Sequence, residues 1–211
     1  MIQTSITEIT DWLKTHANRI VEYSLNPPAS DSEMERLKNL TPHPLPQDYL
    51  AMYKTYNGMN DEENWGNFFY GMLFYPVEEV LSDHEFRVAQ SKDVAMIPLK
   101  HADAGIDKSN FYNPDWIGLA SDGARSSLRL DLSPTSEGDY GQVIFVDGDQ
   151  QVALLIANSV TELLGNFSQD LKSGLYSLNE EALEDGQHFL EPAQSIDIGN
   201  WHHVEKWKKY L

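Results

Sequence analysis

The segment from Asp115 to Asp149 holds the side chains that an active site would need: carboxylates, hydroxyls, two arginines and five glycines. A hydrolase with a serine nucleophile elbow has one glycine two residues before the serine and another two residues after it. Ser121 is followed by Gly123 at this distance but is preceded by Leu119, so the pattern is incomplete. The segment therefore lacks the nucleophile motif of this hydrolase class.

Metal-binding motifs are also incomplete. The stretch "DGDQQV" lacks the third oxygen ligand and the glycine that a calcium loop needs. His84-Glu85 has no second histidine for a zinc motif, and the adjacent His202 and His203 would point in different directions on a helix. The chain has no cysteine, which excludes thiolate ligands and thiolate catalysis. We therefore expect no metal and no cofactor.

The same segment fits a structural role. Asp122-Gly123 lies between two predicted strands and is a favoured hairpin pair, and Gly138, Gly141 and Gly148 lie where strands begin or end. Aspartates in such turns commonly accept backbone N–H bonds. Paired carboxylates for glycoside hydrolysis stay open, because the chain is rich in acids. The segment is predicted to be a turn-rich sheet.

The net charge restricts the possible partners. The chain has 33 acidic and 15 basic residues and a formal charge of -18. Nucleic-acid backbones and anionic membranes attract basic surfaces, so both are disfavoured as partners. Between Leu130 and Glu205 the only basic residue is Lys172. This half of the chain would attract a basic partner, and the alternative is an acidic surface that only keeps the protein soluble.

Hydrophobic spacing predicts helices before and after this segment. The first carries a capping-box pattern at Ser5 and Glu8, and the second begins at Ser30 or Ser32 with a glutamate three residues later. A third begins at Pro46 and ends at Asn57-Gly58. Further helices are predicted over residues 76–91 and from Ser159 onward.

Alternating and continuous apolar runs predict strands. An aromatic run from Phe68 to Tyr75 indicates a buried strand. The next strands form an antiparallel meander joined by acidic turns, and the second of them alternates as a half-buried strand does. The predicted meander consists of Trp116–Ala120, Ser127–Leu132, Gln142–Val146 and Val152–Ala157.

The C-terminal stretch "WHHVEKWKKYL" has Trp201, Val204 and Trp207 at a spacing that forms one helical face. Lysines 206, 208 and 209 form another face, near the end of the helix where positive charge is favourable. We expect this helix to close over the core rather than to bind a partner. No stretch approaches the roughly 18 apolar residues of a membrane span, and the N-terminus lacks the pattern of a signal peptide. The expected location is the cytoplasm.

Three blocks in series resemble the SUKH superfamily, which includes fungal cell-wall-assembly regulators and many bacterial immunity proteins. The blocks are "LPQDYLAMYKTYNG" at residues 45–58, "WIGLASDGARSSLRLDLSP" at 116–134 and "GQVIFVDGD" at 141–149, followed by a helix near 159–167. The resemblance extends from Leu45 to about Phe167. After Asp122-Gly123 the family continues with small residues and an asparagine, whereas this chain has Ala124-Arg125-Ser126-Ser127, so no role tied to that turn is carried over.

The resemblance implies a single α+β domain in which N-terminal and C-terminal helices pack against a mostly antiparallel sheet. It divides the chain into an N-terminal helical segment (1–44), a SUKH-like core (45–175) and a C-terminal extension (176–211) that ends in a short helix. It also implies no catalytic activity. Bacterial members look like antidotes that bind and block a toxin, often a nuclease.

The main interpretation is therefore an immunity protein that neutralises a basic toxin by direct binding, since complementary charge speeds association. A regulatory scaffold that binds an endogenous protein is the alternative, and an uncharacterised hydrolase is the third. Acids in or beside loops of the predicted sheet are the candidate contacts with the partner. They are Asp122, Asp131, Glu137, Asp139, Asp147 and Asp149.

Overall fold

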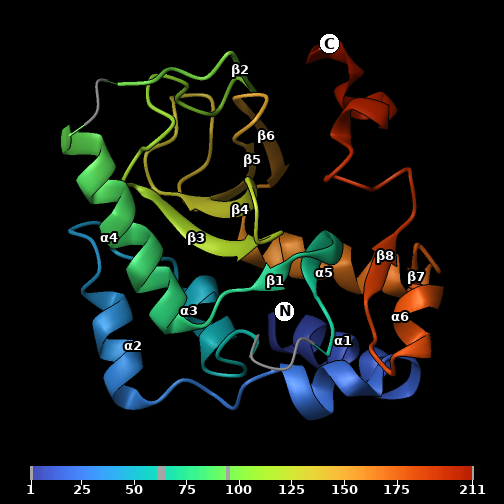
Figure 1. The fold of residues 1–211 in the computed structure, drawn as a ribbon. Coiled ribbons are helices and arrows are strands. Elements are labelled where there is room, and N and C mark those ends of the chain that lie inside the picture. The colour runs from blue at the N-terminus through green and yellow to red at the C-terminus, as the bar shows by residue number, and fades with distance from the viewer. Residues whose placement is uncertain (1, 61–64, 94–95, 211) are drawn as a thin grey trace.

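A six-stranded sheet forms the centre of the computed structural model, which describes residues 2–60, 65–93 and 96–210 (Figure 1). In spatial order its strands are β1 (Leu73–Phe74), β3 (Trp116–Ser121), β4 (Ser126–Asp131), β5 (Gln142–Asp147), β6 (Val152–Ala157) and β2 (His101–Ala102). The pairs from β1 to β6 are antiparallel, and β2 joins β6 in parallel. The predicted α+β class with a mostly antiparallel sheet is confirmed.

Both faces of the sheet are covered. On one face Leu128, Leu130 and Phe145 join the large core beneath the helices. On the other face a smaller core holds Trp116 and Ile144 together with residues of the loop that precedes β3. Strand β4 was predicted to be half-buried, but the polar side chains of Ser127, Arg129 and Asp131 are buried as well. They lie on the face opposite its leucines and so form part of the interior.

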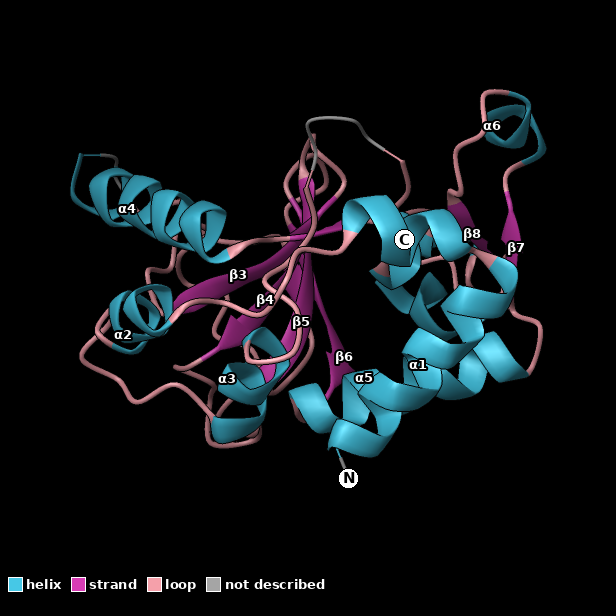
Figure 2. Cartoon of the chain, turned by 90° about the horizontal axis from the view of Figure 1, so that it is seen from below, coloured by secondary structure: helices cyan, strands magenta, loops and turns pink. Residues whose placement is uncertain are grey.

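Helices α1 (Ile2–His16), α3 (Gln47–Tyr53) and α5 (Val160–Lys172) contribute to the large core, and α1 lies beside α5 (Figure 2). Helix α4 (Val77–Asp93) packs along β3 and against α2 (Asp31–Lys38). These helices and one face of the sheet together build the large core.

Of the capping boxes predicted at Ser30 and Ser5, the structure confirms the first and not the second. Ser30 accepts the backbone N–H of Glu33, and the Glu33 carboxylate accepts the backbone N–H of Ser30 at 2.7 Å, so this capping box is confirmed. The capping box at Ser5 is wrong, because α1 already begins at Ile2. Glu8 instead accepts hydrogen bonds from Ser168 and Lys172 of α5, at 2.9 and 2.7 Å.

The prediction of a strand over residues 68–75 is largely wrong. A 3₁₀ turn, η2 (Phe69–Gly71), precedes the two-residue strand β1. Tyr70 and Gly71 have φ angles of 51° and 82°, which interrupt an extended chain. The aromatic rings of this segment are buried against Phe167 of α5. Burial alone does not distinguish a strand from a compact aromatic turn.

The C-terminal extension closes over the core as expected. Strands β7 (Tyr176–Leu178) and β8 (Leu190–Pro192) form a hairpin around α6 (Glu180–Glu184). Two 3₁₀ helices follow, η3 (Trp201–His203) and η4 (Glu205–Tyr210), and they bury Trp201, Val204 and Trp207. In the described part of the chain, no helix is both long enough and apolar enough to span a membrane.

Candidate functional site

The six predicted contact acids divide between the two ends of the sheet. Pairing of Ser126 with Asp147 places one end of β4 beside the end of β5, and pairing of Asp131 with Gln142 defines the opposite end. Asp122, Asp147 and Asp149 lie at the first end. Asp131, Glu137 and Asp139 lie at the second end or in the loop beyond it. The structure therefore does not gather them into one patch.

Asp131 is fully buried and belongs to the interior. Its Oδ1 accepts the indole N–H of Trp116 at 3.1 Å and the backbone N–H of Ser133 at 2.9 Å, and its Oδ2 accepts the side-chain amide of Gln142 at 2.8 Å. Burial raises the pKa of Asp131 above its ordinary value, although these hydrogen bonds oppose the shift. The position of this carboxylate indicates a role in joining β3, β4 and β5.

Asp147 is also buried and holds the C-terminal segment in place. Its Oδ2 accepts the indole N–H of Trp201 at 2.9 Å, and its Oδ1 accepts the backbone N–H groups of Asp149 and Gln150, both at 2.9 Å. One carboxylate thus fixes the β5–β6 turn and anchors η3.

The other four predicted acids are exposed and stay predictions as partner contacts. Asp122 accepts the backbone N–H groups of Ala124 and Ser126 and so shapes the β3–β4 turn. Asp149 forms an ion pair with Arg125 at 2.9 Å across an open rim. Glu137 and Asp139 lie in the loop between β4 and β5, at the far end of the sheet.

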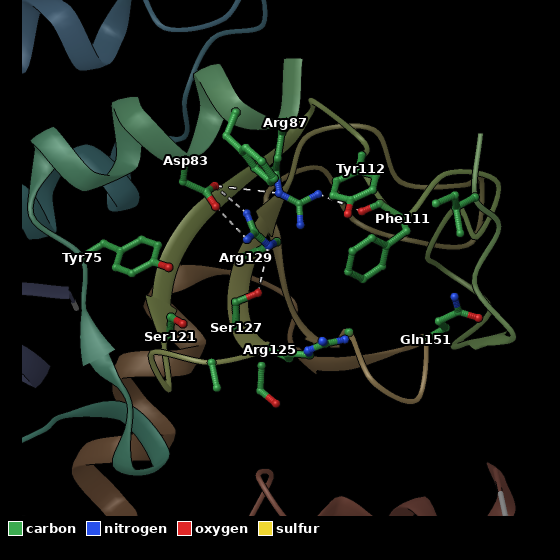
Figure 3. Close-up of a pocket in the computed structure, with 15 residues that line it drawn as sticks. Tyr75, Asp83, Arg87, Phe111, Tyr112, Ser121, Arg125, Ser127, Arg129 and Gln151 are labelled. Atoms are coloured by element: carbon green, nitrogen blue, oxygen red, sulfur yellow. Dashed lines mark hydrogen bonds and ion pairs between the residues drawn. The ribbon is translucent and has the colours of Figure 1, made fainter. Parts of the chain in front are cut away.

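A cavity of about 530 Å³ opens where the β3–β4 and β5–β6 turns meet α4 and the loop before β3 (Figure 3). Arg125 at its rim and Arg129 on its floor come from the β3–β4 turn and from β4, and Asp83 and Arg87 come from α4. The cavity thus has three arginines and one carboxylate in its lining, within a strongly acidic chain.

Arg129 and Asp83 form the fixed part of this site. Two guanidinium nitrogens of Arg129 donate to the two carboxylate oxygens of Asp83 at 2.7 and 2.9 Å, and Arg129 Nε donates to Ser127 Oγ at 3.0 Å. Burial raises the pKa of Asp83, but the hydrogen bonds and charge of Arg129 outweigh it and lower the pKa below its ordinary value. The two-point pair joins α4 to the sheet.

Arg87 is buried, but its charge is less well matched. Its Nη1 donates to the carbonyl oxygen of Phe111 at 2.8 Å, while its Nε has no hydrogen-bond partner and lies 3.9 Å from the Asp83 carboxylate that already binds Arg129. Burial and the neighbouring charge of Arg129 lower the pKa of Arg87 to about 9. Two buried guanidinium groups therefore share one carboxylate.

Exposed apolar side chains adjoin the cavity. Phe86 of α4 is 53% exposed, lines the opening and makes an edge-to-face contact with Tyr112. Met96 is 70% exposed and directly precedes Ile97, another lining residue. Exposed aromatic and methionine side chains beside arginine have the composition of protein-binding surfaces.

This cavity was not predicted from the sequence. Asp83 and Arg87 are four residues apart in a predicted helix, and this spacing places them on one face. Arg129 alternates with the leucines of a predicted strand, so it had to point away from their core. These two signals were available, but the sequence did not show that α4 crosses the face on which Arg129 lies.

The lining of the cavity indicates which chemical group it could bind. Among the residues that the structure describes, no group of three or more His, Cys, Asp and Glu side chains is placed to hold a metal ion. The cavity instead offers guanidinium donors, hydroxyls and aromatic walls. Such a lining suits an anionic group.

Comparison with known proteins identifies the family. A sequence model described as the SMI1 / KNR4 family (SUKH-1) matches residues 28–166, which is more than half of the chain. The match includes α2, α3 and α4, the six-stranded sheet and the first half of α5. The resemblance seen in the three sequence blocks is confirmed and reaches further toward the N-terminus.

Several fungal proteins are similar to this chain. The cell wall biosynthesis/cell cycle regulator smi1 of Schizosaccharomyces pombe is 26% identical over 149 residues, which cover 65% of this chain and 30% of that protein. The cell wall assembly regulator SMI1 of Saccharomyces cerevisiae is 28% identical over 103 residues, covering 49% of this chain and 19% of that protein. A glucan synthesis regulatory protein of Neurospora crassa is 32% identical over 81 residues, covering 38% and 15% respectively. The chain thus matches less than a third of the length of these relatives. On the evidence of the family match, it belongs to the SMI1 / KNR4 family (SUKH-1).

Proposed function

We propose that this protein is a non-catalytic regulator that acts by binding an endogenous protein partner. The names of its relatives describe regulators of cell-wall assembly and glucan synthesis, which favours regulation over the toxin neutralisation expected first from the sequence. The supporting observation in the structure is the exposed pair Phe86 and Met96 beside the arginine-lined cavity. Large apolar side chains at the centre of an interface commonly supply most of its affinity.

The test compares two exposed apolar sites on the full-length protein, one beside the cavity and one away from it. A Phe86→Ser/Met96→Ser variant removes the proposed contacts, and Leu183→Ser on α6 is the control, because Leu183 is also exposed but lies away from the cavity. A partner is identified by cross-linking in the native host and then purified. We expect the double variant to bind it at least about tenfold more weakly, as loss of a binding hot spot implies, while Leu183→Ser binds normally.

A cellular measurement links this binding to regulation. Deletion of the gene in its own host is expected to change growth under cell-wall stress, and the wild type and Leu183→Ser should both restore it. The Phe86→Ser/Met96→Ser variant should not. Equal partner affinity and equal rescue by all three proteins would show that this surface does not carry the function.

Toxin neutralisation is the second candidate, favoured by the formal charge of -18 and by the exposure of four of the predicted acids. Here the product of an adjacent gene should be toxic alone and harmless when co-expressed with this protein. Replacing the exposed acids at the sheet ends by Asn or Gln should abolish protection from the toxic product. The same replacement of four acids of the N-terminal helices should leave protection intact. The first set is Asp122, Glu137, Asp139 and Asp149, and the control set is Asp11, Glu22, Asp31 and Glu35.

A further inference from the structure

The charges around the cavity are not balanced. Arg87 and Arg129 are 4% and 5% exposed, and they share the single carboxylate of Asp83. Buried charges in proteins are normally paired, because removing an ion from water is costly. One buried positive charge is therefore left without a carboxylate of its own. The chain is rich in carboxylates, yet only that of Asp83 pairs with these two arginines in the described residues. The unbalanced positive charge therefore points to an anionic ligand.

Arg87 lines the cavity and has donors that make no hydrogen bond to the described residues. Its Nε makes no hydrogen bond, and among the described residues its Nη2 makes none either. Figure 3 shows its guanidinium group directed into the space between Arg129, Phe111 and Arg125. Nε is buried 3.9 Å from Asp83 Oδ2, so Nη2 is the group of this guanidinium that can donate to an oxyanion in the cavity. The contact to Phe111 O holds the opposite side of the group and fixes its orientation.

Arg125 supplies a third cation that can move. It pairs with Asp149 at the rim, where the two side chains are 69% and 63% exposed. An exposed pair of this kind contributes little to stability, so Arg125 can turn toward a bound anion at low cost. Three arginines from α4, the β3–β4 turn and β4 then surround one space. Their charge, less that of Asp83, matches the roughly two negative charges of a phosphate monoester near neutral pH.

The remaining lining defines the other half of the ligand. Phe111 and Tyr112 are in edge-to-face contact with ring centroids 5.0 Å apart, and Phe86 continues this aromatic wall toward the opening. Ser121, Ser126 and Ser127 also line the cavity. Flat apolar groups pack against such walls, while hydroxyls suit phosphate oxygens.

We propose that this cavity binds a phosphate monoester carried on a flat apolar group, with Arg87 and Arg125 as the residues that hold the phosphate. Arg129 is a positioning residue, because its pair with Asp83 fixes the floor of the site. The proposal shares Phe86 with the protein-binding surface, but it rests on Arg87 and Arg125. Substitutions at these two arginines therefore test it separately from the Phe86→Ser/Met96→Ser variant.

Phenyl phosphate is the probe, titrated into the full-length protein in a low-salt buffer that contains no phosphate. Binding is followed by calorimetry and by the nitrogen–proton NMR signal of the Arg87 Nε–H. We expect saturable binding that shifts this signal. Phenol, which lacks the phosphate, should bind at least about tenfold more weakly, since hydrogen bonds to a charged group are each worth a factor of roughly ten or more.

Three variants test the assignment. Arg87→Gln should weaken phenyl phosphate binding about tenfold or more. The melting temperature of the ligand-free variant is measured alongside, so that a loss of binding is distinguished from a loss of the fold. Arg125→Gln lies at the exposed rim, leaves the core untouched and should weaken binding several-fold. The matched control is Arg36→Gln, which removes an exposed arginine that pairs with Glu78 outside the cavity and should bind normally.

Three results would overturn the proposal: no saturable binding of phenyl phosphate at millimolar concentration, equal affinity for phenol, or unchanged affinity in both Arg87→Gln and Arg125→Gln. A tripeptide with a central phosphotyrosine distinguishes two sources of the same chemistry. Tighter binding than phenyl phosphate assigns the ligand to a phosphorylated side chain. Weaker binding assigns it to a small molecule.

Discussion

Asp131 shows how a single side chain stabilises the sheet. Its carboxylate accepts three hydrogen bonds, and two of the donors, Trp116 and Gln142, belong to fully buried residues. Asp131→Asn would place an amide N–H₂ where at least one donor already points. We expect the free energy of unfolding to fall by about 2–4 kcal/mol, the usual cost of leaving buried polar groups unpaired.

The measurement for Asp131→Asn is urea unfolding at neutral pH. Glu137→Gln is the control, because Glu137 is also acidic and near this end of the sheet but is exposed. Its free energy of unfolding should change by less than about 0.5 kcal/mol. Equal stability of the two variants would show that the three hydrogen bonds to Asp131 contribute little.

Residue type alone did not separate the buried acids from the exposed ones. Asp131 and Asp147 were grouped with Asp122 and Asp149 because all four lie in or beside predicted loops. The donors that account for their burial, Trp116 and Trp201, are 15 and 54 residues away in the chain. Such long-range partners follow from tertiary packing, which local spacing does not encode.

At the scale of elements, α1 is an integral part of the fold although it lies outside the part of the chain that the family model matches. Leu13 of α1 is fully buried in the core that α1 shares with α5. Leu13→Ala removes three carbon atoms from this contact and leaves a cavity. We expect the free energy of unfolding to fall by about 2–5 kcal/mol.

Unfolding monitored by circular dichroism tests this expectation, with the exposed neighbour Lys14→Ala as the control. The whole transition should shift in Leu13→Ala, because α1 and the sheet share one core. A transition that splits, so that α1 melts before the sheet, would show that α1 is only an appendage.

The central strands were predictable to within about one residue at each end, and β6 was predicted with its observed bounds. Their apolar residues alternate or run continuously between glycine-containing turns, a pattern that burial in a sheet requires. Strands β1 and β2 have two residues each, so they carry no periodicity of their own. Their pairing depends on where the preceding loops place them. The cavity escaped prediction for the same reason, because α4 and β4 meet there only in three dimensions.

At the scale of the whole molecule, buried tyrosines link stability to alkaline pH. Burial raises the pKa of Tyr49, Tyr53, Tyr70 and Tyr176 well above its ordinary value of 10. The unfolded chain loses these protons more readily than the folded chain. The buried, protonated tyrosines therefore contribute fully to the free energy of unfolding below pH 10, and this contribution is lost as the pH rises above 10.

Absorbance at the tyrosinate band and circular dichroism, recorded together during an alkaline titration, test this linkage. We expect the tyrosinate absorbance of Tyr49, Tyr53, Tyr70 and Tyr176 to rise only as the secondary structure is lost. Ionisation of all ten tyrosines in one step, with the circular dichroism spectrum unchanged, would contradict it.

The short edge strands of the sheet also limit how this protein can recognise others. A long free edge invites a strand from another chain to add to the sheet, in recognition and in aggregation alike. Here β1 and β2 occupy the edges with two residues each, and the carbonyl oxygen of Gly118 in β3 is taken by the Tyr49 hydroxyl at 2.8 Å. Few backbone groups at the edges of this sheet are therefore open to pairing with a strand of another chain. Recognition through side chains on the helices and turns remains, and the fold can vary those side chains from one family member to the next without disturbing its hydrogen-bonded frame.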